Sequence, residues 1–427
     1  MIKGKISTII TKIKKIPHIF INGFIFRDGF QWLQKAYVYP PIRFIKPYWF
    51  EKEISLGLQR NTHISYDISE KFKKKLKQTL NLNNVEIIPV SSGRTAFRLA
   101  LQTLKKIHPE RKEVIIPTYG CRGIIDPVVE AGLKPVFVDI YNELHADPQQ
   151  VTSIFHSGVL ACLCVHLCGK KMSIISIAKK AKQYGIFLIE DQCQNLGGEI
   201  LYPEDSNLSG FSIYSFGIGK NLMATAGGAL IARTYKQEIF EESKSLLGED
   251  TAFAYHRFSY HYRSYFSSPE KINTHSYQQS LSGIYQYRTI NPFDAELLQI
   301  GLDRLVDIIH LRQNNATQII KLLSQFPELY SFQNTKNHIY TKLSIIFPSK
   351  TCRKDFQRFM AYKGIETEAM YTPLHLRDIG KPYQKIPLQS SESIYPRVLN
   401  IPVRPNLSSS EMQRIQETIY DFAKMEL

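Results

Sequence analysis

Cysteine is scarce in this chain, which contains six among 427 residues. Small secreted proteins that depend on disulfides carry many cysteines in a short chain, whereas here they crowd the middle of a long one. This distribution argues against a disulfide scaffold and favours a reducing compartment. The cysteines are Cys121, Cys162, Cys164, Cys168, Cys193 and Cys352.

Long apolar runs are also missing. None approaches the roughly 20 residues that a membrane-spanning helix needs. The N-terminus has no clean apolar stretch followed by a small-residue cleavage site, which disfavours export. We therefore expect a cytoplasmic protein.

Acidic residues are almost absent from the first fifty positions, where nine Lys or Arg residues accompany a single acid, Asp28. This segment carries +8, half of the formal net charge of +16. Its basic residues alternate with Ile, Phe, Trp and Tyr. This pattern is typical of a segment that binds an anionic surface, either the inner face of the membrane or an anionic partner. The equally weighted alternative is an irregular extension that packs on the protein body. Its candidate contacts are Trp32, Tyr37, Trp49 and Phe50.

The rest of the chain has the composition of a folded protein. With 43% hydrophobic and 22% charged residues, it can bury enough apolar surface to offset the entropy cost of ordering. From about residue 85, short apolar runs alternate with helical patterns, which predicts an α/β fold with a mostly parallel sheet. The expected strands are 85–90, 114–119, 135–140, 159–166 and 186–189. The expected crossover helices are 95–105, 123–131 and 173–184.

The alternation stops after residue 230. We expect loops and short helices over 248–287, which is dense in Tyr, His, Phe and Ser, and one long helix over 293–323. Further on, the pattern predicts a strand over 343–347 and helices over 354–363 and 409–425, the last with a Ser-Ser-Ser-Glu start. We divide the chain into a basic aromatic extension (1–54), a large α/β domain (55–300), and a linking helix with a smaller C-terminal α+β domain (301–427).

The most informative stretch is FSIYSFGIGKNLMATAGGALI, residues 211–231. A predicted strand leads into a loop with one lysine, Lys220, and a Gly-Gly pair precedes the next strand. A lysine whose pKa is lowered by desolvation or by a nearby cation can form an imine with an aldehyde. In isolation, Lys220 would more simply be a surface lysine in a turn.

Two upstream motifs make the reactive interpretation stronger. The apolar strand in IFLIEDQCQ, residues 186–194, ends in Asp191, and a buried acid needs a cation such as a protonated pyridine nitrogen. A helix-capping or metal-binding role for Asp191 is the alternative. The turn in PVSSGRTAF, residues 89–97, combines hydroxyls, a glycine and a helix start, which suits a phosphate, although an ordinary helix cap has the same composition.

A second cluster has the composition of a metal site. Cys162, Cys164, His166 and Cys168 share one parity and would face one side of a strand. Ligands spaced along a flat strand converge poorly on one ion, so we interpret them as part of a buried core strand and expect no metal.

In this order, the three motifs together resemble the DegT/StrS family of sugar aminotransferases, which are fold-type-I enzymes dependent on pyridoxal 5'-phosphate. The resemblance covers about residues 55–425. Further matches in order are VIIPTY (114–119), GLKPVFVD (132–139), VHLCG (165–169), YQYR (285–288) and YTPLH (371–375).

The resemblance implies a role for each matching residue. Lys220 would form the imine with the cofactor and later move the proton, and Asp191 would pair with the pyridinium nitrogen that makes the ring an electron sink. Gln194 would lie near the ring's phenolic oxygen. The cofactor phosphate would be bound by Gly93, Thr95 and Ser215, and Gln286 would reach the phosphate in a partner subunit, which implies a homodimer.

The chain departs from the family's pattern at three positions of the matching motifs. Arg94 replaces a common Thr and would add a charged phosphate contact. Gln286 replaces a common Asn. Cys121 stands where the family commonly has an aromatic residue stacked on the cofactor ring, and Tyr119 is a candidate substitute.

The expected function is transfer of an amino group, from glutamate by resemblance, onto a nucleotide-linked keto-sugar for a surface polysaccharide or glycoconjugate. The basic balance suits a diphosphate-bearing substrate, and we expect no nucleic-acid partner. One alternative is a pyridoxal-phosphate enzyme with a non-nucleotide substrate. Another is a non-catalytic, membrane-apposed protein that keeps the fold.

Overall fold

The computed structural model describes residues 42–49, 52, 54–56, 67–141, 144–201, 208–248, 251–266, 278–279, 281, 286–333 and 335–427. Most of the basic segment over 1–50, including Trp32, Tyr37 and Phe50, lies outside these residues. None of the helices in the described part of the chain combines the length and apolar character needed to cross a membrane.

A seven-stranded sheet forms the centre of the larger part, with strand order β1-β7-β6-β5-β4-β2-β3. The strand β7 is antiparallel to both of its neighbours, and the remaining pairs are parallel. The prediction of a mostly parallel sheet is therefore confirmed. Its strands are β1 Glu86–Val90, β2 Glu113–Pro117, β3 Lys134–Val138, β4 Val159–Val165, β5 Phe187–Asp191, β6 Phe211–Ser215 and β7 Gly228–Ala232.

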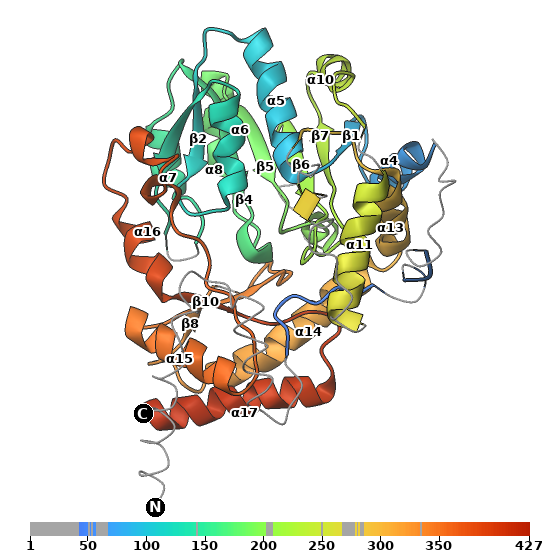
Figure 1. The fold of residues 1–427 in the computed structure, drawn as a ribbon. Helices are drawn as coiled ribbons and strands as arrows, with labels where there is room; N and C mark the ends of the chain where they lie inside the picture. The colour runs from blue at the N-terminus through green and yellow to red at the C-terminus, as the bar shows by residue number, and fades with distance from the viewer. Residues whose placement is uncertain are drawn as a thin grey trace, which may run out of the picture.

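Helices cover both faces of this sheet (Figure 1). On one face, Phe97 of α5 and Val128 of α6 share an apolar cluster with Leu160 of β4. On the other face, Phe72 of α4 and Leu298 of α13 lie in a cluster with strand residues of β1 and β7. The helices of this part are α4 Ile68–Thr79, α5 Gly93–Ile107, α6 Asp126–Glu130, α7 Pro148–Ser153, α8 Ile175–Tyr184, α9 Gly198–Leu201, α10 Lys236–Ser243, α11 Thr251–Phe266 and α13 Pro292–Leu302.

The C-terminal part has its own antiparallel sheet and core. The sheet order is β10-β9-β8, with β8 Ser331–Phe332, β9 Leu343–Ile346 and β10 Val398–Ile401. The helices here are α14 Leu305–Leu323, α15 Lys350–Tyr362, α16 Gln389–Ile394 and α17 Ser409–Glu426. The predicted start of α17 is confirmed, because Ser408 and Glu411 form a reciprocal capping box.

Several helix predictions were wrong in their extent. The helix expected over 293–323 is divided, because the backbone at Arg304 (φ −117°, ψ 9°) leaves the helical region between α13 and α14. The stretch over 123–131 splits into a 3₁₀ turn, Arg122–Ile124, and α6, where Pro127 lies in the first turn of the helix and lacks a donor N–H. The helix α15 begins four residues earlier than expected, since Ser349 caps it.

Loops and short helices were expected over 248–287, but the helix α11 there has 16 residues. Its aromatic and histidine residues have modest helix propensity, so local sequence does not favour a long helix. Tertiary contacts override that preference. Phe258 is 1% exposed and contacts the rings of Trp49 and Phe293.

Candidate functional site

A cavity of about 640 Å³ opens where β4, β5 and β6 end and α5 begins. Ligands of open α/β sheets bind outside the carboxyl ends of the strands, so this is the expected place for chemistry. Seven of the nine predicted site residues line it. They are Gly93, Arg94, Cys121, Asp191, Gln194, Ser215 and Lys220. Thr95 and Gln286 are not among the residues that line it.

The N-terminus of α5 forms one wall of the cavity. Ser92 caps the helix, with its Oγ accepting from the amide of Thr95 at 3.2 Å, and the Thr95 hydroxyl lies 2.9 Å from the hydroxyl of Ser91. Thr95 therefore stabilises the turn at the start of α5 through these hydrogen bonds. The helix amides and the positive end of the helix dipole suit an anion such as a phosphate.

Two glycines keep this wall close to the sheet. A Cβ on Gly93 would lie 2.6 Å from Cys193 Sγ and 3.2 Å from Ser215 Cβ. A Cβ on Gly228, the first residue of β7, would lie 2.6 Å from the Gly93 nitrogen. Any side chain at either position would fill the space between the helix start and the strand ends, so the glycines keep the anion-binding turn open.

The guanidinium of Arg94 forms ion pairs with two acidic residues of the protein. Its Nη1 is 3.2 Å from Asp126 Oδ2, and its Nη2 is 2.5 Å from Glu130 Oε1. Arg122 adds a second cation on Asp126, with 3.0 Å between Nε and Oδ1. The guanidinium of Arg94 thus ties α5 to α6 at the rim of the cavity.

Asp191 is the last residue of β5 and is 7% exposed. Its Oδ1 accepts from the amide of Cys193 at 2.9 Å. Burial, together with the negative charge of Asp191, raises the pKa of the Cys193 thiol well above its ordinary value, so that thiol stays protonated. A buried carboxylate at the edge of a cavity is best stabilised by a cationic group on a bound ligand.

Glu190, next to Asp191, accepts hydrogen bonds from side chains of its own surroundings. The amide of Met172 donates to His166 Nδ1 at 3.0 Å, so His166 Nε2 carries the hydrogen and donates to Glu190 Oε2 at 3.0 Å. Burial raises the pKa of Glu190, but the bonds from His166 and Ser209 outweigh it and hold that pKa below the usual value. The neighbouring acids therefore differ, because Glu190 is fully paired inside the protein and Asp191 faces the cavity.

Lys220 lies in the loop between β6 and β7 and lines the same cavity as Asp191. Its amide donates to the Gly217 carbonyl at 3.2 Å. Further along the loop, Asp294 Oδ1 accepts from the amide of Thr225 at 2.8 Å and from its hydroxyl at 2.6 Å. Arg257, which is 0% exposed, donates to Asp294 Oδ2 at 3.1 Å and completes a buried ion pair behind the loop.

Gln194 is fixed by two partners. Its Oε1 accepts from the amide of Cys168 at 2.7 Å, and its Nε2 donates to the hydroxyl of Tyr371 at 3.0 Å. Burial raises the pKa of Tyr371 well above its ordinary value, so this hydroxyl remains neutral. Sequence reasoning did not identify Tyr371 as a site residue, although it begins one of the matching stretches.

Among the residues that the structure describes, those that line the cavity around Cys121 include no aromatic side chain. Residues 121–124 line the cavity there, and Cys121 Sγ accepts from the amide of Gly123 at 3.4 Å. Tyr119 is 1% exposed, and its hydroxyl donates to the Met370 carbonyl at 3.2 Å within a separate apolar cluster. The structure therefore gives no support to Tyr119 as a substitute for a stacking residue.

Gln286 is exposed and lies away from the lining of the cavity. Its Oε1 accepts from Arg288, at 3.2 Å from Nε and 2.6 Å from Nη2. The backbone of this segment is anchored at the same turn as the helix start, since the amide of Ser91 donates to the Arg288 carbonyl at 2.9 Å.

The cysteines of β4 belong to the core. Cys162 and Cys164 are 1% exposed and lie in an apolar cluster, whereas Cys168 contacts the Ser344 hydroxyl on the C-terminal part. In the part of the chain that the structure describes, no group of three or more His, Cys, Asp or Glu side chains is placed to hold a metal ion.

As far as the structure describes its lining, the cavity thus combines a helix start suited to an anion, the carboxylate of Asp191 and the amine of Lys220. These features suit a small ring compound that carries a phosphate, a basic ring nitrogen and an aldehyde.

Comparisons with known proteins agree with this chemistry. The sequence model of the DegT/DnrJ/EryC1/StrS aminotransferase family matches residues 50–420. The chain is 25% identical over 356 residues to the GDP-perosamine synthase of Escherichia coli O157:H7, covering 83% of this chain and 89% of that protein. It is 24% identical over 379 residues to a Bacillus subtilis protein named 3-oxo-glucose-6-phosphate:glutamate aminotransferase, covering 84% and 76% of the two chains.

The fold is also similar to a solved structure. The crystal structure of NtdA from Bacillus subtilis, with bound cofactor PMP, superposes with a TM-score of 0.69 at 20% identity and covers 88% of this chain and 83% of that one. This similarity supports the predicted fold class, a large domain with a mostly parallel sheet and a smaller C-terminal α+β part.

Proposed function

The chain belongs to the DegT/DnrJ/EryC1/StrS aminotransferase family, which depends on pyridoxal phosphate, and we propose that it transfers an amino group from glutamate to a nucleotide-linked keto-sugar. The product would serve the synthesis of a surface polysaccharide or glycoconjugate. The observation that carries the proposal is the convergence of Lys220, Asp191 and the start of α5 on one cavity.

Each wall of the cavity has one task in this reaction. The amides at the start of α5, with Gly93 and the Ser215 hydroxyl, would bind the cofactor phosphate, while Thr95 stabilises that turn. Asp191 would pair with the protonated ring nitrogen, and Gln194 would lie near the ring's phenolic oxygen. When bound, the cofactor supplies an electron sink for the carbon that exchanges its amino group.

Lys220 has two tasks. Its ε-amine would hold the cofactor through the cofactor's aldehyde, and the same amine would act as the base that moves a proton at the substrate carbon. Arg94 contributes by ordering the rim through its ion pairs with Asp126 and Glu130.

The substrate class is supported by charge and by relatives. The net charge of +16 raises the local concentration of anionic substrates, and a nucleotide-linked sugar carries a diphosphate. The name GDP-perosamine synthase describes a relative that makes a nucleotide sugar. A sugar phosphate without a nucleotide is the second candidate, because the name of another relative specifies 3-oxo-glucose-6-phosphate and glutamate.

We further propose that the active unit is a homodimer in the cytoplasm. The support is that Gln286 is exposed with its Oε1 bound by Arg288, and that the family resemblance implies its amide would contact the cofactor phosphate of a partner subunit. The basic residues 1–50 would bring the enzyme to an anionic membrane surface, the inner face of the membrane.

The decisive experiment follows the visible absorbance band of the purified protein. With pyridoxal phosphate, the unaltered protein should show a band of the lysine-bound cofactor, and glutamate should convert it. A panel of nucleotide-linked keto-sugars and of oxo-sugar phosphates should then restore the band only with the true acceptor class.

Lys220→Ala is the matched variant. It should fold normally, lose the band, and trap no cofactor on the chain with borohydride, because no amine remains to bind the aldehyde. Trapped cofactor on Lys220→Ala would show that the lysine assignment is wrong. An unaltered protein that acquires no band at all would favour a non-catalytic role.

A further inference from the structure

Residues 42–49 cross the molecule from the C-terminal part to the loop of Lys220. We call this segment the strap. At its start, the amide of Ile42 donates to the Gly364 carbonyl at 2.8 Å, and the Ile42 carbonyl accepts from the amide of Glu366 at 2.9 Å. The Phe44 amide then donates to Glu366 Oε2 at 2.8 Å. The strap is therefore attached to the C-terminal part by its backbone.

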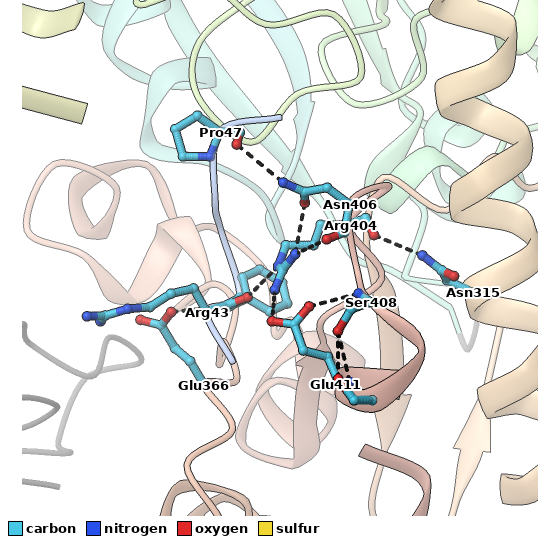
Figure 2. Close-up of polar contacts among 10 residues, drawn as sticks. Arg43, Pro47, Asn315, Glu366, Arg404, Asn406, Ser408 and Glu411 are labelled. Carbon is cyan, nitrogen blue, oxygen red and sulfur yellow. Dashed lines mark hydrogen bonds and ion pairs between the residues drawn. The ribbon is translucent and has the colours of Figure 1, made fainter. Parts of the chain in front are cut away.

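Arg404 anchors the middle of the strap, as Figure 2 shows. It is 3% exposed, and its Nε donates to the Arg43 carbonyl at 3.0 Å. Its other nitrogens bind Asn406 and Glu411, the latter at 2.6 Å. Asn406 in turn donates to the Pro47 carbonyl at 3.4 Å.

The end of the strap contacts the lysine loop. The hydroxyl of Tyr48 hydrogen-bonds to the carbonyl of Lys220 itself, and it lies 2.7 Å from the carbonyl of Asn221. Trp49 Nε1 donates to the Met223 carbonyl at 3.3 Å. Tyr48 and Trp49 are each 5% exposed, so solvent does not readily replace these donors.

Packing brings the same two segments together. The ring of Trp49 stacks on Phe258 with 4.8 Å between centroids, which holds the indole in place. Gly219 has a φ of +93°, and a Cβ there would lie 3.3 Å from Ile45. The residue before Lys220 thus turns tightly against the strap.

From these contacts we propose that Tyr48 is a positioning residue for Lys220, and that the strap couples the C-terminal part to the place where the ε-amine stands. Its hydroxyl contacts the carbonyls of residues 220 and 221 and so holds the backbone there, and Tyr48 is not among the residues that line the cavity. The side chain of Lys220 starts from that backbone. A small displacement there moves the amine, and misplacement of a reacting group by about 1 Å can cost on the order of 100-fold in rate.

The inference rests on the proposed role of Lys220, but part of its test does not. Tyr48→Phe removes one hydroxyl and keeps the ring. In cofactor-free protein, we expect hydrogen exchange at the amides of residues 217–224 to accelerate about five- to tenfold, the equivalent of one lost hydrogen bond. Trp49→Phe, which keeps the stacked ring and removes one donor, should accelerate exchange chiefly around Met223.

Tyr330→Phe is the matched control. Tyr330 is 3% exposed in the C-terminal core, and its hydroxyl has no hydrogen-bond partner among the described residues. This variant should leave exchange in the loop unchanged. Equal exchange in Tyr48→Phe and Tyr330→Phe would overturn the proposal.

A second measurement separates positioning from general damage. Pyridoxamine phosphate has no aldehyde, so it binds without joining the lysine, whereas pyridoxal phosphate must also attach. In Tyr48→Phe, affinity for pyridoxamine phosphate should stay within about twofold, while attachment of pyridoxal phosphate slows about tenfold. If the affinity for pyridoxamine phosphate and the rate of pyridoxal phosphate attachment fell by the same factor, Tyr48 would be merely structural. Failure of the proposed function would instead appear as a missing band in the unaltered protein, with the exchange result still standing.

Discussion

The Lys220 loop is held from two sides by different chemistry. On the side of Lys220, Tyr48 and Trp49 donate neutral hydrogen bonds to backbone carbonyls. On the side of β7, Asp294 accepts from the amides of Thr225 and Ala226 and is paired with Arg257. The loop is therefore bound through its carbonyls at one end and through its amides at the other.

The two attachments also differ in where they come from. Asp294 and Arg257 lie on α13 and α11, helices that cover the same sheet from which the loop emerges. Tyr48 and Trp49 belong to the strap, which is anchored on the C-terminal part through Arg404. The end of the loop at β7 is thus fixed to its own sheet, while the end with the reactive amine is connected to a different part of the molecule.

Removing the buried acid should produce the largest effect. Asp294→Ala leaves the guanidinium of Arg257 without its counter-charge and removes the acceptor for Thr225 and Ala226. Loss of one partner of a buried ion pair costs about 3–5 kcal/mol in the free energy of unfolding. Urea denaturation should show this loss, with Asp307→Ala, an exposed acid on α14, changing stability by less than about 0.5 kcal/mol.

A double variant divides that loss between its causes. Arg257→Met with Asp294→Leu removes both charges and should recover most of the ion-pair contribution. If the double variant were as unstable as Asp294→Ala, the unsatisfied loop amides, and not the orphaned charge, would account for the loss.

The residues facing the cavity were predictable because their signals are local. Asp191 and Ser215 end apolar strands, and Gly93 follows a strand and begins a helix, so the parallel sheet brings them to one edge. Whether those side chains would point to a ligand or to the protein was not predictable. Arg94 illustrates this, because its ion pairs with Asp126 and Glu130 depend on how α5 packs against α6.

Neither attachment of the loop was predictable from sequence. Tyr48 and Lys220 are 172 positions apart, and the strap has no periodic pattern that would indicate its path. Of the two interpretations of the first fifty residues, the packing one holds for Trp49, which is buried against Phe258. Arg257 lies in a stretch expected to form loops and short helices, and only its burial beside Asp294 identifies it as structural.

Loosening the strap at its anchor should have an intermediate effect. Arg404→Ala removes the donor to the Arg43 carbonyl and leaves Glu411 and Asn406 with fewer partners. These partners are half-buried, and a hydrogen bond contributes a net of about 0.5–1.5 kcal/mol, so losing several of them should lower the free energy of unfolding by about 1–3 kcal/mol. Attachment of pyridoxal phosphate should also slow, because the strap holds Tyr48. Arg404→Lys keeps the charge but cannot donate to all three partners. Its stability should lie between that of the unaltered protein and that of Arg404→Ala. Normal attachment in Arg404→Ala would separate the anchor from the loop.

The smallest effect at neutral pH should come from His261, which lies between the two attachments. It sits on α11 with Arg257, and its ring contacts Trp49 edge-on with 6.4 Å between centroids. Burial, and then the charge of Arg257, lowers the pKa of His261 to about 3. An unfolded histidine has a pKa of about 6.5, so between these values the unfolded chain binds a proton that the folded protein does not. The contribution of a neutral His261 to stability is therefore complete above about pH 6.5 and is lost as the pH falls toward 3.

His261→Phe keeps a ring against Trp49 and cannot titrate. Its free energy of unfolding should match that of the unaltered protein at pH 8 and should fall less steeply between pH 6 and 4, by up to about 1.4 kcal/mol per pH unit, when both are measured by urea denaturation. Parallel curves for the two proteins would show that His261 is protonated while folded, and that the strap and the Arg257 ion pair do not enclose it.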